Sequence, residues 1–215
     1  MQLLPHPDSA PGPVRQFDGT AAYGADGALQ LSWTLRGDLF RLRIPPATTP
    51  RSADELWRHT CFEAFVADPH SSGYLELNFA PSGEWAAYGF RSYRTGMAPL
   101  PLKKIPAARW HQAADKLTLA VDFRMDDLPG PPGPRPPVAL RVGLAAVLES
   151  DQGALTWWAL RHPPGKPDFH HADAFVGRLD VLDHVDFGGD ALQFGEAGDL
   201  DAVDADAEPA GGNWC

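Results

Sequence analysis

The chain has 215 residues, of which 44% are hydrophobic, and it carries a formal net charge of −10 at pH 7. This length fits one domain with a sizeable core, and no apolar run is long enough to cross a membrane as a helix. Eight acidic residues and no lysine or arginine fall within 184–215, so −10 less this −8 leaves about −2 for residues 1–183. A nearly neutral body does not form a phosphate-binding surface, which argues against nucleic acid as a partner.

The two ends of the chain are expected to lie outside the folded domain. Residues 1–13 have no strand-like pattern and are expected to form a flexible N-terminal segment, without the charged start and apolar core of a secretory signal. Residues 184–215 are rich in aspartate, glycine and alanine, a composition typical of a disordered acidic tail, with an interaction tail as the alternative. The two cysteines, Cys61 and Cys215, form neither a disulfide framework nor a metal-binding spacing. We therefore expect a cytoplasmic protein whose single domain spans 14–183.

Short runs of alternating apolar and polar residues recur along the domain between breaks rich in glycine and proline. This pattern is typical of antiparallel strands joined by turns. The prolines cluster outside the runs, and only 52–59 indicates a helical turn. The expected strands, in chain order, are 29–35, 39–44, 60–67, 74–80, 85–90, 117–123, 138–148, 155–161 and 175–182. The sequence therefore predicts an all-β fold, an antiparallel β-sandwich.

The strands 60–67 and 74–80 have one apolar face and one mixed face. Glu63 lies on the mixed face of the first strand, and Glu76 and Asn78 lie on the mixed face of the second. A hairpin centred near residues 69–70 pairs Phe62 with Leu77, which keeps the apolar residues together. The same register places Glu63 directly opposite Glu76.

The following strand, 85–90, is expected to add Trp85 to the mixed face, opposite Asn78. Two carboxylates facing each other across strands lie roughly 5 Å apart and repel. Their repulsion is relieved by a cation, by a bound metal, or by a shared proton that raises one pKa. A structural ion pair with Arg141 or Arg161 is one interpretation of the two glutamates, and a ligand-facing role or a catalytic acid pair are the others.

Three further motifs have a structural and a functional interpretation. The loop 161–171 contains three of the eight histidines, but without a spacing that fixes metal geometry, so packing of a proline-rich loop over the sandwich is preferred. Cys61 follows His59 by two residues, and we interpret Cys61 as a small core residue in preference to a nucleophile activated by His59. The adjacent Trp157 and Trp158 face opposite sides of a strand, so one is expected in the core. The other can stack on a sugar ring or cover the sandwich edge.

Several segments together resemble bacterial DOMON-like domain proteins. They are LWRHTCFEAF (56–65), YLELNFAPSGEW (74–85), GLAAVLE (143–149), WWALRHP (157–163) and GKPDFHH (165–171). The resemblance extends over about residues 14–182. The wider DOMON group is similar to family 9 carbohydrate-binding modules, in which a Val-Glu-Val-Phe strand precedes an Asn-Pro-x-Gly turn. Residues 62–65 and 78–83 occupy comparable places.

The resemblance implies a jelly-roll-like sandwich, with two sheets arranged as in immunoglobulin-like domains, that binds a sugar or, in other branches, haem. Haem-binding relatives use a methionine and a histidine as axial ligands. This chain has Met1, Met97 and Met125 and no evident pairing of a methionine with a histidine on a strand, so a sugar is the preferred ligand.

The sequence thus predicts a non-catalytic domain that binds a small polar ligand, with a carbohydrate favoured and no cofactor or metal required. A haem-binding domain, a hydrolase that uses Glu63 and Glu76, and a protein-interaction module are the alternatives. The expected ligand-binding residues are Glu63, Glu76, Asn78, Trp85, Trp157 and Arg161.

Overall fold

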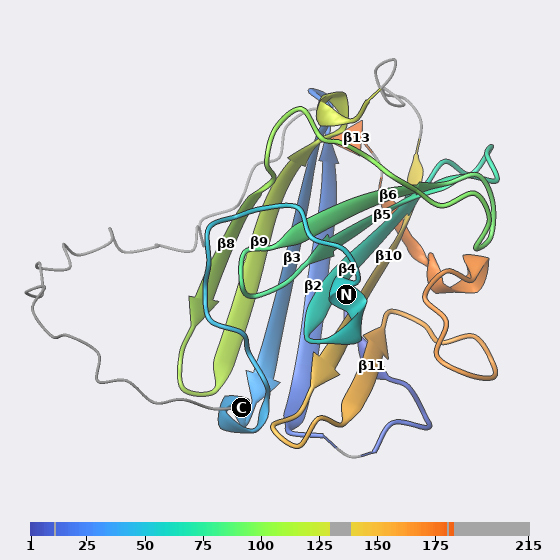
Figure 1. Ribbon diagram of the computed structural model, residues 1–215. Helices are drawn as coiled ribbons and strands as arrows, with labels where there is room; N and C mark the ends of the chain where they lie inside the picture. Colours follow the sequence, from blue (N-terminus) through green and yellow to red (C-terminus); the bar gives the residue numbers. More distant parts are fainter. Residues whose placement is uncertain (11, 130–138, 180, 183–215) are drawn as a thin grey trace, which may run out of the picture. The chain divides into compact units, whose positions relative to one another are not determined.

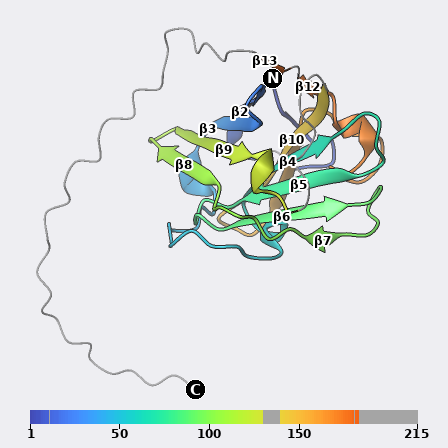
Figure 2. The ribbon, with the colours of Figure 1, turned by 90° about the horizontal axis from the view of Figure 1, so that it is seen from above.

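The computed structural model describes residues 1–10, 12–129, 139–179 and 181–182, whose strands form two stacked sheets (Figures 1 and 2). The strands of the larger sheet are β1 (Leu4–Pro5), β4 (Cys61–Ala67), β5 (Tyr74–Phe79), β6 (Trp85–Phe90), β7 (Ala98–Pro99), β10 (Leu140–Glu149), β11 (Leu155–Ala159) and β12 (Gly177–Leu179). Those of the smaller sheet are β2 (Val14–Gly24), β3 (Ala28–Gly37), β8 (Ala107–Gln112), β9 (Lys116–Arg124) and β13 (Val181–Leu182). Short 3-10 turns occur at η1 (Leu39–Arg41), η2 (Leu56–Arg58), η3 (Met125–Asp127) and η4 (Ala172–Ala174).

The two sheets are almost entirely antiparallel, which confirms the predicted all-β sandwich. The larger sheet has the order β1-β11-β10-β4-β5-β6-β7, with β12 paired to β10, and the smaller has the order β13-β2-β3-β9-β8. Within the described residues, the short pairing of β13 with β2 is the parallel one. In the same residues no helix is long and apolar enough to span a membrane.

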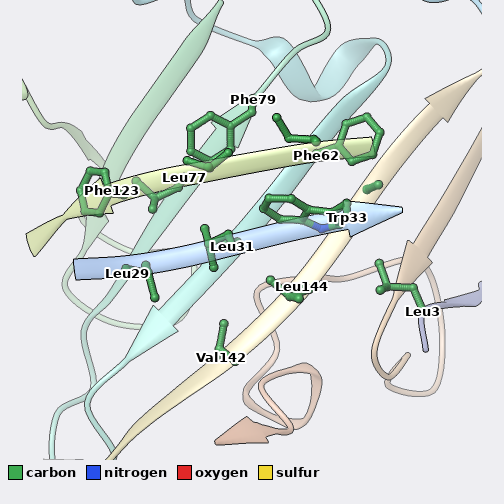
Figure 3. Close-up of a cluster of buried hydrophobic side chains, with 14 of the residues drawn as sticks. Leu3, Leu29, Leu31, Trp33, Phe62, Leu77, Phe79, Phe123, Val142 and Leu144 are labelled. Carbon is green, nitrogen blue, oxygen red and sulfur yellow. The ribbon is translucent and has the colours of Figure 1, made fainter. Parts of the chain in front are cut away.

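The core lies between the sheets and is built from the inward residues of each strand. Trp33 from β3 and Phe62 from β4 are fully buried and meet edge to face, with ring centroids 6.1 Å apart (Figure 3). Leu77 from β5 and Leu144 from β10 are likewise fully buried and come from the same sheet as Phe62. Because alternate residues of a strand point to opposite faces, each of these strands sends every second side chain into this core.

The structure differs from the predicted strands in several places. Residues 39–44, expected as a strand, begin with η1, and Leu39 and Leu42 are buried at a spacing of three while Phe40 is 86% exposed. The strands β1, β2, β7 and β8 were not predicted. In β2, Gly19 lies at a core position where a Cβ would come within 2.8 Å of Leu144 Cδ1. The glycine therefore takes the place of an apolar side chain and interrupts the alternating pattern that predicts a strand.

The N-terminal segment 1–13, expected to lie outside the domain, contributes to the sandwich. Leu3 is buried in the core, and β1 pairs with β11 through Leu4 and Ala159. The ammonium group of Met1 donates to the carbonyl oxygen of Gly19 at 2.8 Å. The predicted acidic tail, 184–215, lies outside the described residues.

The hairpin of β4 and β5 has a register that differs by two residues from the predicted one. Glu63 pairs with Asn78, and Glu76 pairs with Phe65, so the two glutamates are diagonal rather than direct neighbours. A shift of two residues leaves every side chain on its original face, because the side-chain period of a strand is two. Glu63, Glu76 and Asn78 therefore share one face, as the sequence predicts.

The hairpin of β5 and β6 has a register that differs by one residue, and this difference reverses the faces of β6. Phe79, and not Asn78, pairs with Trp85. The connecting turn is closed by the amide of Ala80, which donates to the carbonyl of Glu84, and Gly83 adopts a φ of +89° that favours glycine. Trp85 consequently points into the core between the sheets, which corrects its predicted place on the mixed face.

Candidate functional site

A cavity of about 340 Å³ lies on the face of the larger sheet that points away from the smaller sheet. The sheet supplies its floor, and three segments distant in sequence form its rim: the loop around η2, the loop between β6 and β7, and the loop 163–171 that precedes η4 (orange in Figure 1). Its lining residues are Trp57, Glu63, Glu76, Phe90, Arg94, Met97, Val147, Trp157, Pro167, Phe169 and His170. Two carboxyl groups thus lie at the base of a pocket whose walls are largely aromatic and apolar.

Glu63 is a buried acid with an unsatisfied oxygen. Its side chain lies on β4 directly opposite Asn78 of β5, and both residues are almost fully buried. Glu63 Oε1 and Asn78 Oδ1 have no hydrogen-bond partner within the described part of the chain. Burial, together with the neighbouring charge of Glu76, raises the pKa of Glu63 well above its usual range. The fold therefore disfavours the ionised form of Glu63 unless a ligand compensates its charge.

Glu76 is buried as well, but it has polar neighbours on both of its oxygens. Asn78 Nδ2 donates to Glu76 Oε1 at 2.7 Å, and His170 Nε2 lies 3.8 Å from Glu76 Oε2. Burial raises the pKa of Glu76 to about 7, although the hydrogen bond from Asn78 and the charge of Arg94 both favour the ionised form. Glu76 consequently changes charge near neutral pH.

The protonation of His170 follows from its contacts with Tyr74. The hydroxyl of Tyr74 accepts from the backbone amide of Arg94 at 3.2 Å, and it lies 2.8 Å from His170 Nδ1. We assign the hydroxyl proton to that second contact, which makes Nδ1 the acceptor and leaves the ring proton on Nε2, facing Glu76. Burial and the charge of Arg94 lower the pKa of His170 to about 4. His170 is therefore a neutral donor at the edge of the acid pair.

Arg94 links the loop after β6 to the loop 163–171. Its Nη2 pairs with Asp168 Oδ1 at 2.7 Å, while the hydroxyl of Tyr93 donates to Asp168 Oδ2 at 2.6 Å. Asp168 also accepts from the backbone amide of His170. Arg94 is thus ion-paired with a carboxylate outside the cavity lining, while its charge still acts on Glu76 and His170.

The walls of the cavity present two indole rings. Trp57 extends from η2 and meets Tyr88 edge to face at 5.7 Å, and Trp157 extends from β11. Both indoles are partly exposed, whereas the adjacent Trp158 is buried in the core between the sheets. The sequence correctly predicts that one of the two neighbouring tryptophans is a core residue.

The structure brings together four of the six predicted site residues and places the other two elsewhere. Glu63, Glu76 and Trp157 line the cavity, and Asn78 lies beneath it between the two acids. Trp85 belongs to the core, and the exposed Arg161 is not among the lining residues. The predicted place of Trp85 on the mixed face is therefore corrected, and Arg161 lies outside the lining of this cavity.

Within the described residues, neither Arg141 nor Arg161 forms the ion pair with Glu63 or Glu76 that the sequence suggested. Arg141 donates instead to the carbonyl oxygens of Ala172 and Phe175, and so holds the segment around η4 against β10. The sequence did not identify Trp57, Arg94 and His170 as site residues, although it predicted that the loop 161–171 packs over the sandwich. Trp57, Arg94 and His170 converge because of how their loops pack, and no local sequence pattern predicts the position of those loops.

The motif of His59 and Cys61 is structural. Cys61 is fully buried, and burial raises the pKa of its thiol well above the usual range, while His59 Nδ1 lies 2.7 Å from Glu149 Oε2. Cys61 thus fills the sheet face as predicted. No cluster of three or more histidine, cysteine or acidic side chains suited to a metal ion is present in the described ranges.

Haem does not fit the residues of this cavity. Met97 and His170 both line it, a pairing that the sequence did not reveal. His170 Nδ1 is occupied by Tyr74, and Nε2 carries its proton toward Glu76, so neither ring nitrogen has a free lone pair for iron. The two buried carboxyl groups at the floor of the cavity are polar where a porphyrin ring requires an apolar surface.

Comparisons with known proteins identify related folds rather than a family. No family model matches the chain, and no curated protein matches it. A protein of Bacteroides uniformis ATCC 8492, provisionally named a carbohydrate-binding protein, is similar with a TM-score of 0.62 and 13% identity, over 84% of this chain and 86% of that one.

Two further solved structures are family 9 carbohydrate-binding modules from Caldicellulosiruptor kristjanssonii. The complex with glucose has a TM-score of 0.45 and 10% identity over 83% of this chain and 82% of that one. The complex with cellotriose has a TM-score of 0.48 and 10% identity over 88% and 86%. At such low identity, the similarity to the Bacteroides protein shows a shared β-sandwich fold.

Proposed function

We propose that this chain is a non-catalytic carbohydrate-binding domain whose site is the cavity formed around Glu63 and Glu76. The observation that carries the proposal is the combination, in one cavity, of two partly exposed indoles with buried carboxyl and amide oxygens that lack partners. Indole rings pack against the apolar face of a sugar ring, and carboxylate or amide oxygens accept its hydroxyl protons. The name given to the Bacteroides uniformis protein of similar fold agrees with this proposal.

The size of the cavity favours a small ligand. Its volume of about 340 Å³ lies at the lower end of the range of about 300–1,000 Å³ that is typical of small-molecule pockets. This volume suits one or two sugar rings better than a long chain. A closer relationship to DOMON-like domains and to family 9 carbohydrate-binding modules is part of the proposal.

Binding of glucose, cellobiose and cellotriose, measured by isothermal titration calorimetry, tests the proposal. We expect replacement of Trp157 by alanine to weaken the affinity at least about tenfold, because a stacked ring contributes more than about 1.4 kcal/mol to binding. Replacement of Phe40 by alanine, which removes an exposed aromatic ring outside the cavity, is the matched control and is expected to leave affinity unchanged. Failure of the wild-type domain to bind any sugar would contradict the proposal.

The raised pKa of both glutamates also favours a second candidate, a hydrolase in which one of them acts as a general acid. Glu76, with a pKa of about 7, would be the group that exchanges a proton with a substrate. The two functions are distinguished by whether the bound sugar is cleaved. Chromatography after long incubation with cellotriose is expected to return the sugar intact, and release of glucose would establish the hydrolase instead.

A further inference from the structure

We infer that Glu63, Glu76 and Asn78 together bind the ammonium group of an amino sugar or a related amino polyol. This inference rests on the proposed function, because it names the chemical class of ligand for the same cavity. Glu63 and Asn78 face each other across β4 and β5, and Glu76 lies on the same face, diagonal to Glu63. Their side chains form the polar floor, which is the name used below for these three residues.

When both glutamates are ionised, the polar floor has acceptors in excess of donors. The amide group of Asn78 is committed to Glu76, which leaves Asn78 Oδ1 and Glu63 Oε1 buried and without partners. Such orphaned acceptors are costly unless a ligand or water supplies hydrogen. Glu76 Oε2 has His170 Nε2 at 3.8 Å, beyond hydrogen-bond distance, and is a third acceptor with spare capacity. A sugar hydroxyl donates one hydrogen to this floor, whereas an ammonium group donates three.

The charges around the polar floor also favour a cation. Arg94 is paired with Asp168, and His170 is neutral at pH 7 because burial lowers its pKa to about 4. The titratable and charged groups that act on the two glutamates from the surrounding elements are Cys61, Tyr74, Tyr88, Arg94 and His170. Among these described residues, Arg94 supplies a positive charge that acts on Glu76, and it is already ion-paired with Asp168. Two buried carboxyl groups can therefore both ionise only when a ligand brings the charge.

Binding of an ammonium group should consequently release protons. Burial raises the pKa of both glutamates, and Glu76, with a pKa of about 7, is partly protonated in the free domain at neutral pH. A bound cation favours the ionised form of both groups and drives their protons into solution. The affinity for an amine then falls by at least about tenfold for each pH unit below the pKa of Glu76, because at least the proton of Glu76 must leave before the charged pair forms.

Calorimetric titration of the full chain with glucosamine and with glucose, at pH 7.0 and pH 5.5, tests the inference. At pH 7.0 we expect glucosamine to bind at least about tenfold more tightly than glucose, and at pH 5.5 most of this advantage is lost. Parallel titrations in buffers of different ionisation enthalpy should show proton release with glucosamine and none with glucose. Glucose that binds as tightly as glucosamine would overturn the inference while the proposed function stands. Failure of both sugars to bind would overturn both.

Variants that preserve shape while removing charge locate the effect. Glu63→Gln and Glu76→Gln are each expected to abolish the preference for glucosamine over glucose, measured as the ratio of the two affinities. Asp115→Asn, which removes an exposed carboxylate between β8 and β9, makes the same change in net charge and is expected to keep the preference. Loss of the preference in Asp115→Asn as well would show that overall charge, and not the polar floor, attracts the amine.

Discussion

Replacement of Trp85 by alanine is expected to lower the free energy of unfolding by about 3 to 5 kcal/mol, the range for removing a large aromatic side chain from a packed core. Trp85 is 8% exposed and belongs to the core cluster between the sheets. Its indole nitrogen has no hydrogen-bond partner within the described residues, so the stability that it provides comes from apolar burial of the ring. Urea denaturation followed by circular dichroism measures the change directly.

The matched control is Trp157→Ala, which removes the same side chain from the wall of the cavity. Because this indole is partly exposed, we expect its removal to change the free energy of unfolding by only about 1 kcal/mol, while ligand binding is lost. The reverse pattern, in which Trp85→Ala keeps full stability but loses binding, would restore Trp85 to the site that the sequence first suggested. The pair of variants thus separates core from site with one type of residue.

Replacement of Glu76 by glutamine is expected to stabilise the domain increasingly as the pH rises from about 4.5 to 7. The ordinary pKa of this carboxyl is 4.5, and burial raises it to about 7 in the fold. The folded state therefore binds more protons than the unfolded state in this interval, and the contribution of Glu76 to stability falls as pH rises. A shift of this size corresponds to a gain on the order of 2 to 3 kcal/mol for the glutamine variant at pH 7.5, and to almost none at pH 4.5.

His170 titrates in the opposite sense and must be separated from this effect. Burial lowers its pKa from 6.5 to about 4, so the unfolded state binds more protons between these values and stability rises with pH. The pH profile of the wild-type protein therefore combines two opposing trends. The difference between Glu76→Gln and wild type, measured by denaturation at each pH, isolates the carboxyl. A difference that does not change between pH 4.5 and 7.5 would mean that Glu76 is not a buried acid.

The sequence by itself determined the fold class and the shared face of Glu63, Glu76 and Asn78. Alternation with a period of two reports which side of a strand a residue occupies, and the observed shift of two residues in the β4–β5 register leaves that information intact. Alternation also correctly divided Trp157 from Trp158. These features are local, because each depends on residues that are neighbours in one strand.

Only the tertiary structure decided which other residues join the site. The face of Trp85 depends on a one-residue difference in the β5–β6 turn, and turn geometry is a weaker signal than strand periodicity. Trp57, Arg94 and His170 reach the cavity from three separate loops, and their positions follow from contacts such as the pairing of Arg94 with Asp168, 74 residues apart. Loops carry no periodic pattern, so the packing of the whole chain places their side chains beside the buried acids.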